Sequence, residues 1–213
     1  MSEKEKKLIE IARRVSQCTN CPLHKTATNP VPGAGNPEAK IVFIGEAPGF
    51  HEDQQGLPFV GAAGKLLERL LALIDLKREE VFICNMLRHR PPGNRDPLPE
   101  EMKACQPFLD EQIKVIDPKI LVTLGRFSMN KFLPGAYISQ VHGVARYVNF
   151  AGKKRIVIPM YHPAAALRNG RVMTAFRNDF QRIPRFLFES LNQEETEEVV
   201  SEEKTQDEQM GLF

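Results

Sequence analysis

The chain has 213 residues, of which 42% are apolar and 26% charged, with four cysteines and no tryptophan. This length suffices for one domain with a substantial core and no disulfides. No apolar run reaches the ~18 residues of a membrane span, and the N-terminus lacks a secretory apolar segment. We therefore expect neither a membrane-bound nor a secreted protein, but a cytoplasmic one of bacterial type.

The predicted elements begin with an amphipathic helix over residues 4–16 and a loop rich in Cys, Pro and Gly over residues 18–37. Strands are predicted at residues 40–44, 81–84, 120–124, 141–150 and 154–159. Helices are predicted at residues 61–73 and 99–116, from residue 126, and at residues 174–191. Strands that alternate with helices predict an α/β sandwich around a mostly parallel sheet.

The formal charge of +2 combines two unlike parts. Residues 192–213 carry eight acidic residues and one base, Lys204, hence −7, whereas residues 1–191 carry a net +9. A basic body fits a polyanionic partner, although an ordinary solvated surface has the same composition. The acidic segment is typical of disorder, so we expect a domain at 1–191 and a tail at 192–213.

Three unusual segments follow predicted strands. They are Gly45-Glu-Ala-Pro-Gly49, residues 85–96, and Tyr161-His-Pro-Ala-Ala165. Ligands of open α/β sheets bind beyond the carboxyl ends of the strands. The three segments are therefore expected to meet in one site.

The cysteines suggest a second centre. Cys18 and Cys21 form a C-x-x-C pair in a loop, and Cys105 lies in a predicted helix. A fourth donor would complete a metal site, and both Cys84 and His89 are available. Cys84 lies in an apolar strand and His89 in a loop, which favours His89. Zinc and an iron–sulfur cluster suit thiolates equally well.

Taken together, these segments resemble the family 4 uracil-DNA glycosylases, the iron–sulfur branch of that superfamily. The resemblance spans residues 18–188 in the family's order and spacing. It is carried by Cys18-Thr-Asn-Cys21, Gly45-Glu-Ala-Pro-Gly49, Gly56-Leu-Pro-Phe-Val-Gly-Ala-Ala-Gly64, Asn85, Arg90-Pro-Pro-Gly-Asn-Arg-Asp-Pro97, Ala104-Cys105 and Tyr161-His-Pro-Ala-Ala165.

The resemblance implies a three-layer fold around a mostly parallel four-stranded sheet, a [4Fe–4S] cluster, and removal of uracil from DNA in base excision repair by a monomer. The chain departs from the family at His89, where the family has Cys. A DNA-cross-linking branch is similar in having His at this place, but its inserted basic loop is missing here. An iron–sulfur DNA-binding module without activity is a further alternative.

The resemblance also implies roles for the residues of the site. Phe59 would stack on a flipped uracil, Asn85 would read its edge, and the backbone of Gly45, Glu46 and Ala47 would line it. His162 would donate to uracil O2, and Glu46 would position water, with help from Asn94. Glu52 would crowd the C5 side of the base and exclude thymine. The cluster ligands would be Cys18, Cys21, His89 and Cys105.

The DNA contacts and a partner motif complete the expectations. Arg95, Arg168 and Arg171 are placed to contact phosphates. Leu167 is a candidate wedge into the gap left by the flipped base, with core packing as the alternative. Gln209-Met-Gly-Leu-Phe213 resembles the peptide that docks repair proteins on the bacterial sliding clamp through Gln209, Leu212 and Phe213.

Overall fold

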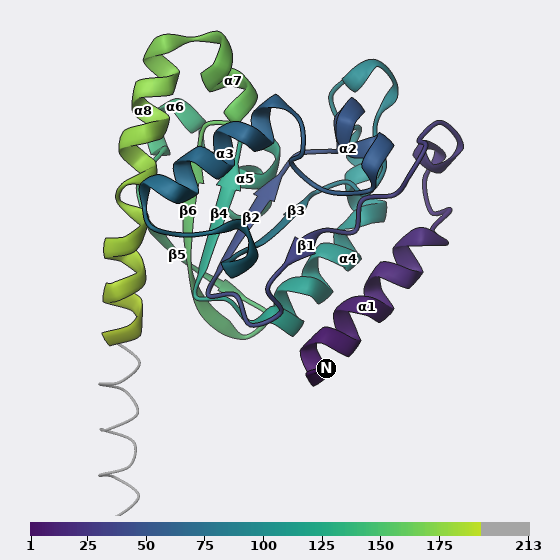
Figure 1. The fold of residues 1–213 in the computed structure, drawn as a ribbon, viewed down its shortest axis with the longest axis horizontal. Coiled ribbons are helices and arrows are strands. Elements are labelled where there is room, and N and C mark those ends of the chain that lie inside the picture. Colours follow the sequence, from purple (N-terminus) through teal and green to yellow (C-terminus); the bar gives the residue numbers. More distant parts are fainter. Residues whose placement is uncertain (193–213) are drawn as a thin grey trace, which may run out of the picture.

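The computed structural model describes residues 1–192, which form three layers with helices on both faces of a central sheet (Figure 1). Within these residues the sheet has six strands in the order β1-β3-β2-β4-β6-β5. The four inner strands are parallel, and an antiparallel strand pairs at each edge. The strands are β1 (Ala34–Gly35), β2 (Ile41–Gly45), β3 (Phe82–Asn85), β4 (Ile120–Leu124), β5 (Arg146–Phe150) and β6 (Lys153–Met160).

The predicted three-layer class and the four parallel strands at its centre are confirmed, and the two edge strands enlarge the sheet. The helices are α1 (Glu3–Ser16), α2 (Phe50–Gln55), α3 (Ala62–Leu73), α4 (Pro99–Ile116), α5 (Arg126–Phe132), α6 (Ile138–Val141), α7 (Pro163–Arg168) and α8 (Gly170–Phe180). Short 3-10 helices are η1 (Pro22–Lys25), η2 (Arg78–Glu80) and η3 (Pro92–Asn94). Among the described residues, no helix combines the length and apolarity that a membrane span requires.

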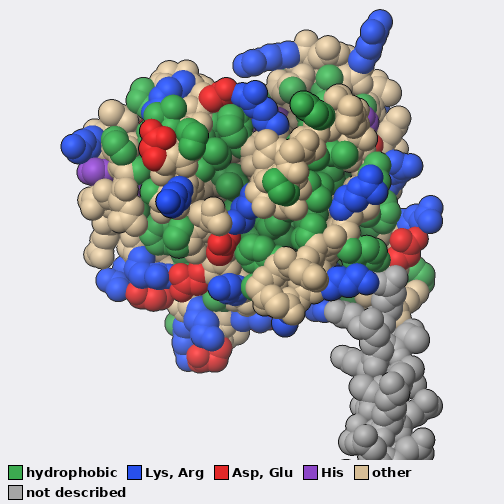
Figure 2. Space-filling view, turned by 180° about the vertical axis from the view of Figure 1, so that it is seen from behind, with side chains coloured by type: hydrophobic (Ala, Val, Ile, Leu, Met, Phe, Trp, Pro, Cys, Tyr) green, Lys and Arg blue, Asp and Glu red, His purple; other side chains and the backbone are tan. Residues whose placement is uncertain are grey.

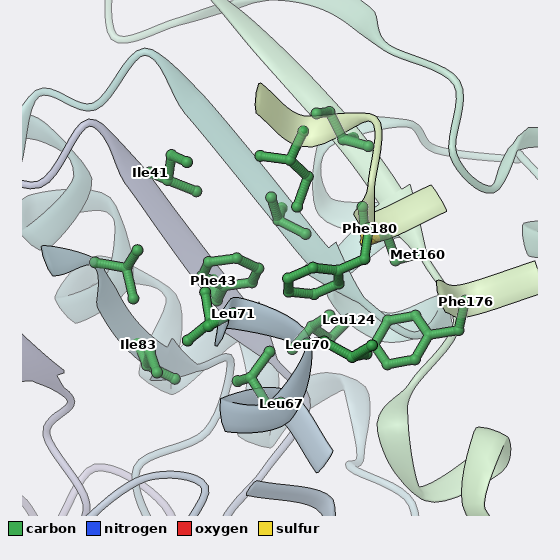
Figure 3. Packing of buried hydrophobic residues seen from close by; sticks show 14 of the residues in the cluster. Ile41, Phe43, Leu67, Leu70, Leu71, Ile83, Leu124, Met160, Phe176 and Phe180 are labelled. Carbon is green, nitrogen blue, oxygen red and sulfur yellow. The ribbon is translucent and has the colours of Figure 1, made fainter. Parts of the chain in front are cut away.

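The two faces of the sheet bury separate cores, because successive side chains of a strand point to opposite sides. On one face Phe43 packs with residues of α3 and α8, and its ring stacks on Phe180 at 5.6 Å between centroids (Figure 3). On the other face Val42 and Ile44 pack with Leu109 of α4. This layering brings the carboxyl ends of the parallel strands to one edge, where β2 and β3 end side by side.

The predicted strand over residues 141–150 is wrong in its first half. Residues Ile138–Val141 form α6, and the strand begins only at Arg146. Gly143 has a φ of 68°, and a Cβ there would lie 2.0 Å from the carboxylate of Asp179. The backbone therefore turns at Gly143 before the extended segment can start.

The predicted helix over residues 174–191 is interrupted. It starts earlier, as α8, and ends at Phe180, and a second helical segment covers residues 183–192. Pro184 explains the break, because its ring would collide with the carbonyl of Phe180 in a continuous helix. The predicted acidic tail lies outside the described residues except for Asn192.

Candidate functional site

A cavity of about 600 Å³ opens at the carboxyl ends of the parallel strands. It is formed by the three segments that the sequence singles out, joined by Gly125 and Arg126 after β4 and by Ile138 of α6. The expected convergence of these segments is therefore observed. The predicted residues that line the cavity are Glu46, Ala47, Phe59, Asn85, Asn94, Arg95, His162 and Arg168.

The floor of the cavity is a narrow slot between Asn85 and Phe59. Gly45 lies between them: a Cβ at this position would come within 2.3 Å of Asn85 Oδ1 and 2.6 Å of the Phe59 ring. Asn85 is buried at 2% exposure, and its Oδ1 has no hydrogen-bond partner. A buried acceptor without a partner is unfavourable, so this part of the cavity favours a ligand that supplies an N–H.

Arg88 holds Asn85 from behind. Its fully buried guanidinium donates from Nη1 to the Asn85 carbonyl at 3.0 Å and from Nη2 to Gln112 Oε1 at 2.8 Å. The backbone of Asn85 is thereby fixed to α4, and its amide side chain is presented to the slot.

His162 caps α7 and lies opposite Phe59, with 6.0 Å between the ring centroids. Its Nδ1 accepts from the Ala164 amide at 3.1 Å, which leaves the ring hydrogen of a neutral imidazole on Nε2. Burial, opposed by the charge of Glu52 and assisted by that of Arg168, lowers the pKa of His162 to about 4. At neutral pH His162 is therefore an uncharged donor.

Glu46 follows β2 and lines the same cavity. Burial, and then the negative charge of Asp96, raise the pKa of Glu46 to about 7, against the opposing charge of Arg126. Asp96 and Arg126 form an ion pair with each other. A carboxyl group that titrates near neutral pH is suited to acid–base work in a cavity.

Glu52 lies on α2 and also lines the cavity. Its Oε1 accepts from the amides of Val60 and Gly61 at 2.9 and 2.8 Å, and its Oε2 from the amide of Gly49 at 3.1 Å. The carboxylate that the resemblance assigns to excluding thymine is thus bonded to the backbone of two loops.

The loop before α4 is tied down by internal contacts. Arg95 donates to both carboxylate oxygens of Glu101, at 2.9 and 2.6 Å, and Glu101 is only 2% exposed. Asn94 is exposed, and its Oδ1 accepts from Arg90 Nε at 2.7 Å. Arg95 was expected to contact phosphate, but its guanidinium binds Glu101 and so anchors the loop.

Residues at the rim of the cavity are exposed. Leu167 is 43% exposed, so it is not part of the core, and its neighbour Arg168 lines the cavity. Arg171 is exposed in the first turn of α8. Lys and Arg side chains are spread over the face drawn in Figure 2, with fewer acidic ones between them.

Cys21 and Cys105 lie in one buried cluster between the η1 loop and α4, and no cysteine lines the cavity. Cys21 and Cys105 are within hydrogen-bond reach of each other, and the neighbouring Cys18 raises the pKa of both thiols. Burial raises the pKa of the Cys105 thiol to about 11. The Cys21 sulfur accepts from the Leu23 amide and the Cys105 sulfur from the Arg88 amide, an arrangement that suits cluster-bound sulfurs.

The described residues do not hold the candidate donors in the arrangement of a metal site. His89 is buried, and burial lowers its pKa. His24 lowers this pKa as well, whereas Asp53 raises it. Cys84 belongs to the core cluster beneath α4, not to the cluster of Cys21 and Cys105. Within residues 1–192 no set of three or more His, Cys, Asp and Glu side chains has metal-binding geometry. The donor chemistry of three free thiols nevertheless fits a thiolate-bound centre.

Comparison with known proteins relates this chain to the uracil-DNA glycosylases. A family model described as the uracil DNA glycosylase superfamily matches residues 32–183. The type-4 uracil-DNA glycosylase of Archaeoglobus fulgidus is 50% identical over 181 residues, covering 83% of this chain and 91% of that protein. Those of Sulfurisphaera tokodaii and Thermotoga maritima are 46% and 44% identical, over 83% and 79% of this chain and 83% and 88% of the proteins themselves.

This chain belongs to the type-4 uracil-DNA glycosylase family. The resemblance predicted from the sequence motifs is therefore confirmed.

Several residues around the site of this type-4 glycosylase were given no role from the sequence, although Arg88 and Asp96 fall within the segment 85–96. Gly125, Asp96 and Arg126 line the cavity, and Arg88 supports it from behind. Their positions depend on strand register and on contacts between distant segments. The placement of Gly125 and Arg126 directly after a predicted strand also pointed toward the site.

Proposed function

We propose that this chain removes uracil from DNA by hydrolysing the N-glycosidic bond, leaving an abasic site for base excision repair. Its family membership supports this. The observation that carries the proposal is the buried, unpartnered Oδ1 of Asn85 in a slot faced by the Phe59 ring. Uracil offers the matching donor at N3–H.

The slot also supports selection of uracil over cytosine. An amide can accept from N3–H and donate to O4 of uracil, whereas cytosine presents an acceptor at N3 and a donor at C4. Binding cytosine would leave the buried Oδ1 of Asn85 unpaired, which is strongly unfavourable. Because the slot lies inside the cavity, the nucleotide must leave the base stack to enter it.

His162 and Glu46 supply the chemistry in this proposal. Bond cleavage places negative charge on the departing base, and the Nε2–H of neutral His162 stabilises that charge at O2. The Glu46 carboxylate orients water and favours the cationic sugar. Asn94, at the cavity wall, helps to hold this water.

DNA binding is proposed to use the rim. Arg168 and Arg171 contact phosphates, and Leu167 enters the space left by the flipped base, which its exposure permits. Arg95 supports the phosphate contacts through the loop that it anchors to Glu101.

The proposal is tested with single- and double-stranded oligonucleotides that contain one uracil, followed by alkaline cleavage of abasic sites. We expect cleavage at the uracil position, and at least a hundredfold slower reaction for His162→Ala. A denaturing gel should show no covalent protein–DNA adduct. This result distinguishes hydrolysis of the glycosidic bond from the reaction of the cross-linking branch. Intact, iron-loaded protein that produces no cleavage would contradict it.

We further propose that the chain holds a [4Fe–4S] cluster through Cys18, Cys21, Cys105 and His89. The three free thiols and the amides that bond two of their sulfurs support this. Hydrolysis moves no electrons, so the cluster would serve to pin the η1 loop to α4. Iron content and visible absorbance should fall in His89→Ala and remain in Cys84→Ala, and the reverse result would assign the fourth ligand to Cys84.

The sequence suggests a protein partner as well. Gln209, Leu212 and Phe213 lie outside the described residues, and the proposal that they dock on a sliding clamp rests on the motif. Removal of residues 209–213 should abolish clamp binding in a pull-down and leave excision from free oligonucleotides unchanged. Clamp binding that persists would refute the proposal.

A further inference from the structure

The backbone of Phe59 has an unusual conformation for a residue that must hold a base in place. Its φ is 52°, in the left-handed region that bulky residues rarely adopt. Phe59 is only 5% exposed, and its ring borders the slot beside Gly45. Other contacts must therefore hold this peptide against its local preference.

Arg78 holds the carbonyl side of the peptide. Its Nη1 donates to the Phe59 carbonyl at 2.9 Å, and its Nη2 donates to the Pro58 carbonyl. Arg78 lies in η2, directly before β3, the strand that ends at Asn85. The planar guanidinium thus spans two successive carbonyls, which suits its fixed fork of donors.

Glu52 holds the amide side of the same segment. Its Oε1 accepts from the next two amides along the chain, those of Val60 and Gly61. A cation therefore binds the carbonyls of residues 58 and 59, while an anion binds the amides of residues 60 and 61. Phe59, with its left-handed backbone, lies between these two sets of hydrogen bonds.

Close packing also restrains the Phe59 peptide. A Cβ at Gly64 would lie 1.8 Å from the Phe59 carbonyl oxygen, so the first turn of α3 presses directly on this peptide. Arg78 also reaches Glu68 of α3 at 3.4 Å, an exposed pair that adds little by itself. The guanidinium contributes mainly through the two carbonyls.

We propose that Arg78 is a positioning residue for uracil excision: together with Glu52 it locks the peptide of residues 58–61 so that the Phe59 ring faces the base slot. Arg78 does not line the cavity and acts only through Phe59. The inference rests on the proposed function, because Phe59 matters as the stacking face for uracil.

The test is a double-mutant cycle on the iron-loaded full chain. Arg78→Met should lower kcat/KM for uracil excision by about 10- to 100-fold, since small misplacements at a reacting centre have effects of this size. In a Phe59→Ala background the same change should have little effect, because no ring is left to position. Arg69→Met, at an exposed position of α3, is the matched control and should leave the rate unchanged.

Each outcome decides the matter. An equal loss in both backgrounds, or no loss from Arg78→Met, would overturn the positioning role. If Arg78→Met does not fold, Arg78→Lys in the same cycle replaces it, since Lys keeps the charge and loses the planar fork. Wild-type protein that releases no uracil would instead overturn the proposed function itself, and the positioning role with it.

Discussion

The proposed base slot depends on the absence of a side chain at Gly45. The space that a Cβ would fill lies between the Asn85 acceptor and the Phe59 ring. Leaving a buried acceptor unpaired costs about 1–3 kcal/mol. In the proposed complex, a base that donates to this acceptor would recover this free energy, so a feature that weakens the fold would strengthen recognition.

Gly45→Ala should therefore collide with the Asn85 amide and the Phe59 ring and disturb the slot. We expect kcat/KM for uracil excision to fall by about a hundredfold or more, since the base can no longer reach its productive position. Gly170→Ala is the control, because a Cβ there meets nothing within 4 Å. Near-normal activity of Gly45→Ala would show that the base binds elsewhere.

The pKa values of Glu46 and His162 predict the pH dependence. Glu46 must be ionised to act, and its pKa is about 7, so kcat/KM should rise with pH through this value. His162, with a pKa of about 4, stays neutral throughout this range. A pH–rate profile of the free enzyme that is flat between about pH 6 and 8 would contradict the role of Glu46.

Two neighbours should move this profile in opposite directions. Asp96→Asn removes the negative charge that raises the Glu46 pKa, so the rising limb should shift to lower pH. Arg126→Gln removes the opposing positive charge, so the limb should shift to higher pH. Shifts of the same sign in both variants would refute this electrostatic account.

Sequence motifs located Gly45, Asn85 and His162 because these residues follow strand ends. They could not show what each side chain bonds to. Arg95 was assigned to phosphate, yet its guanidinium binds Glu101. Arg78 has no motif of its own, since its role depends on a fold that brings residue 78 against residues 58 and 59.

The start of α4 illustrates how a helix end fixes a functional loop. Glu101, in the first turn, accepts from the Leu98 amide at 2.9 Å and from both terminal nitrogens of Arg95. The helix N-terminus itself favours an acidic residue in this turn. One buried carboxylate thus caps the helix and holds the loop that carries Asn94 and Asp96 to the cavity.

Glu101→Ala should lower the free energy of unfolding by about 1–3 kcal/mol, through the lost cap and the lost charged hydrogen bonds. Hydrogen bonding to Arg95 lowers the pKa of Glu101 below 4.5 in the folded protein. Its contribution is therefore present above the ordinary carboxyl pKa and is lost as pH falls through the folded value.

Thermal unfolding at pH 7 and at about pH 3 measures this effect. The difference between wild type and Glu101→Ala should shrink at the lower pH. Glu100→Ala, at an exposed position in the same turn, is the control and should behave like wild type. A difference independent of pH would place the effect of Glu101 in packing and not in its charge.

Elements with strong local signals were predicted best. The bounds of α4 matched because Pro99 starts the helix and Asp117-Pro118 ends it, and β4 is apolar at every position except Thr123. The two-residue β1 and the short α2, α6 and α7 were missed. Their positions depend on distant partners, such as Val81 and Phe82 beside β1, which local periodicity does not encode.

At the level of the whole molecule, the separation of charge explains how a chain of net charge +2 suits DNA. The body carries +9 and the last 22 residues −7, so the average conceals a basic domain. Binding through two or more phosphates predicts that kcat/KM falls about tenfold or more between ~50 and ~200 mM salt. A salt-independent rate would show that phosphate contacts do not contribute.

The most direct measurement is the amount of free uracil released from an oligonucleotide with one uracil, together with the number of abasic sites formed. Wild-type protein should release one uracil for each abasic site, and Asn85→Ala should release it at least a hundredfold more slowly. Wild-type protein should release no cytosine from the matching strand that contains cytosine at the same position. Failure of the intact wild-type protein to release uracil, or equal release by Asn85→Ala, would contradict the account.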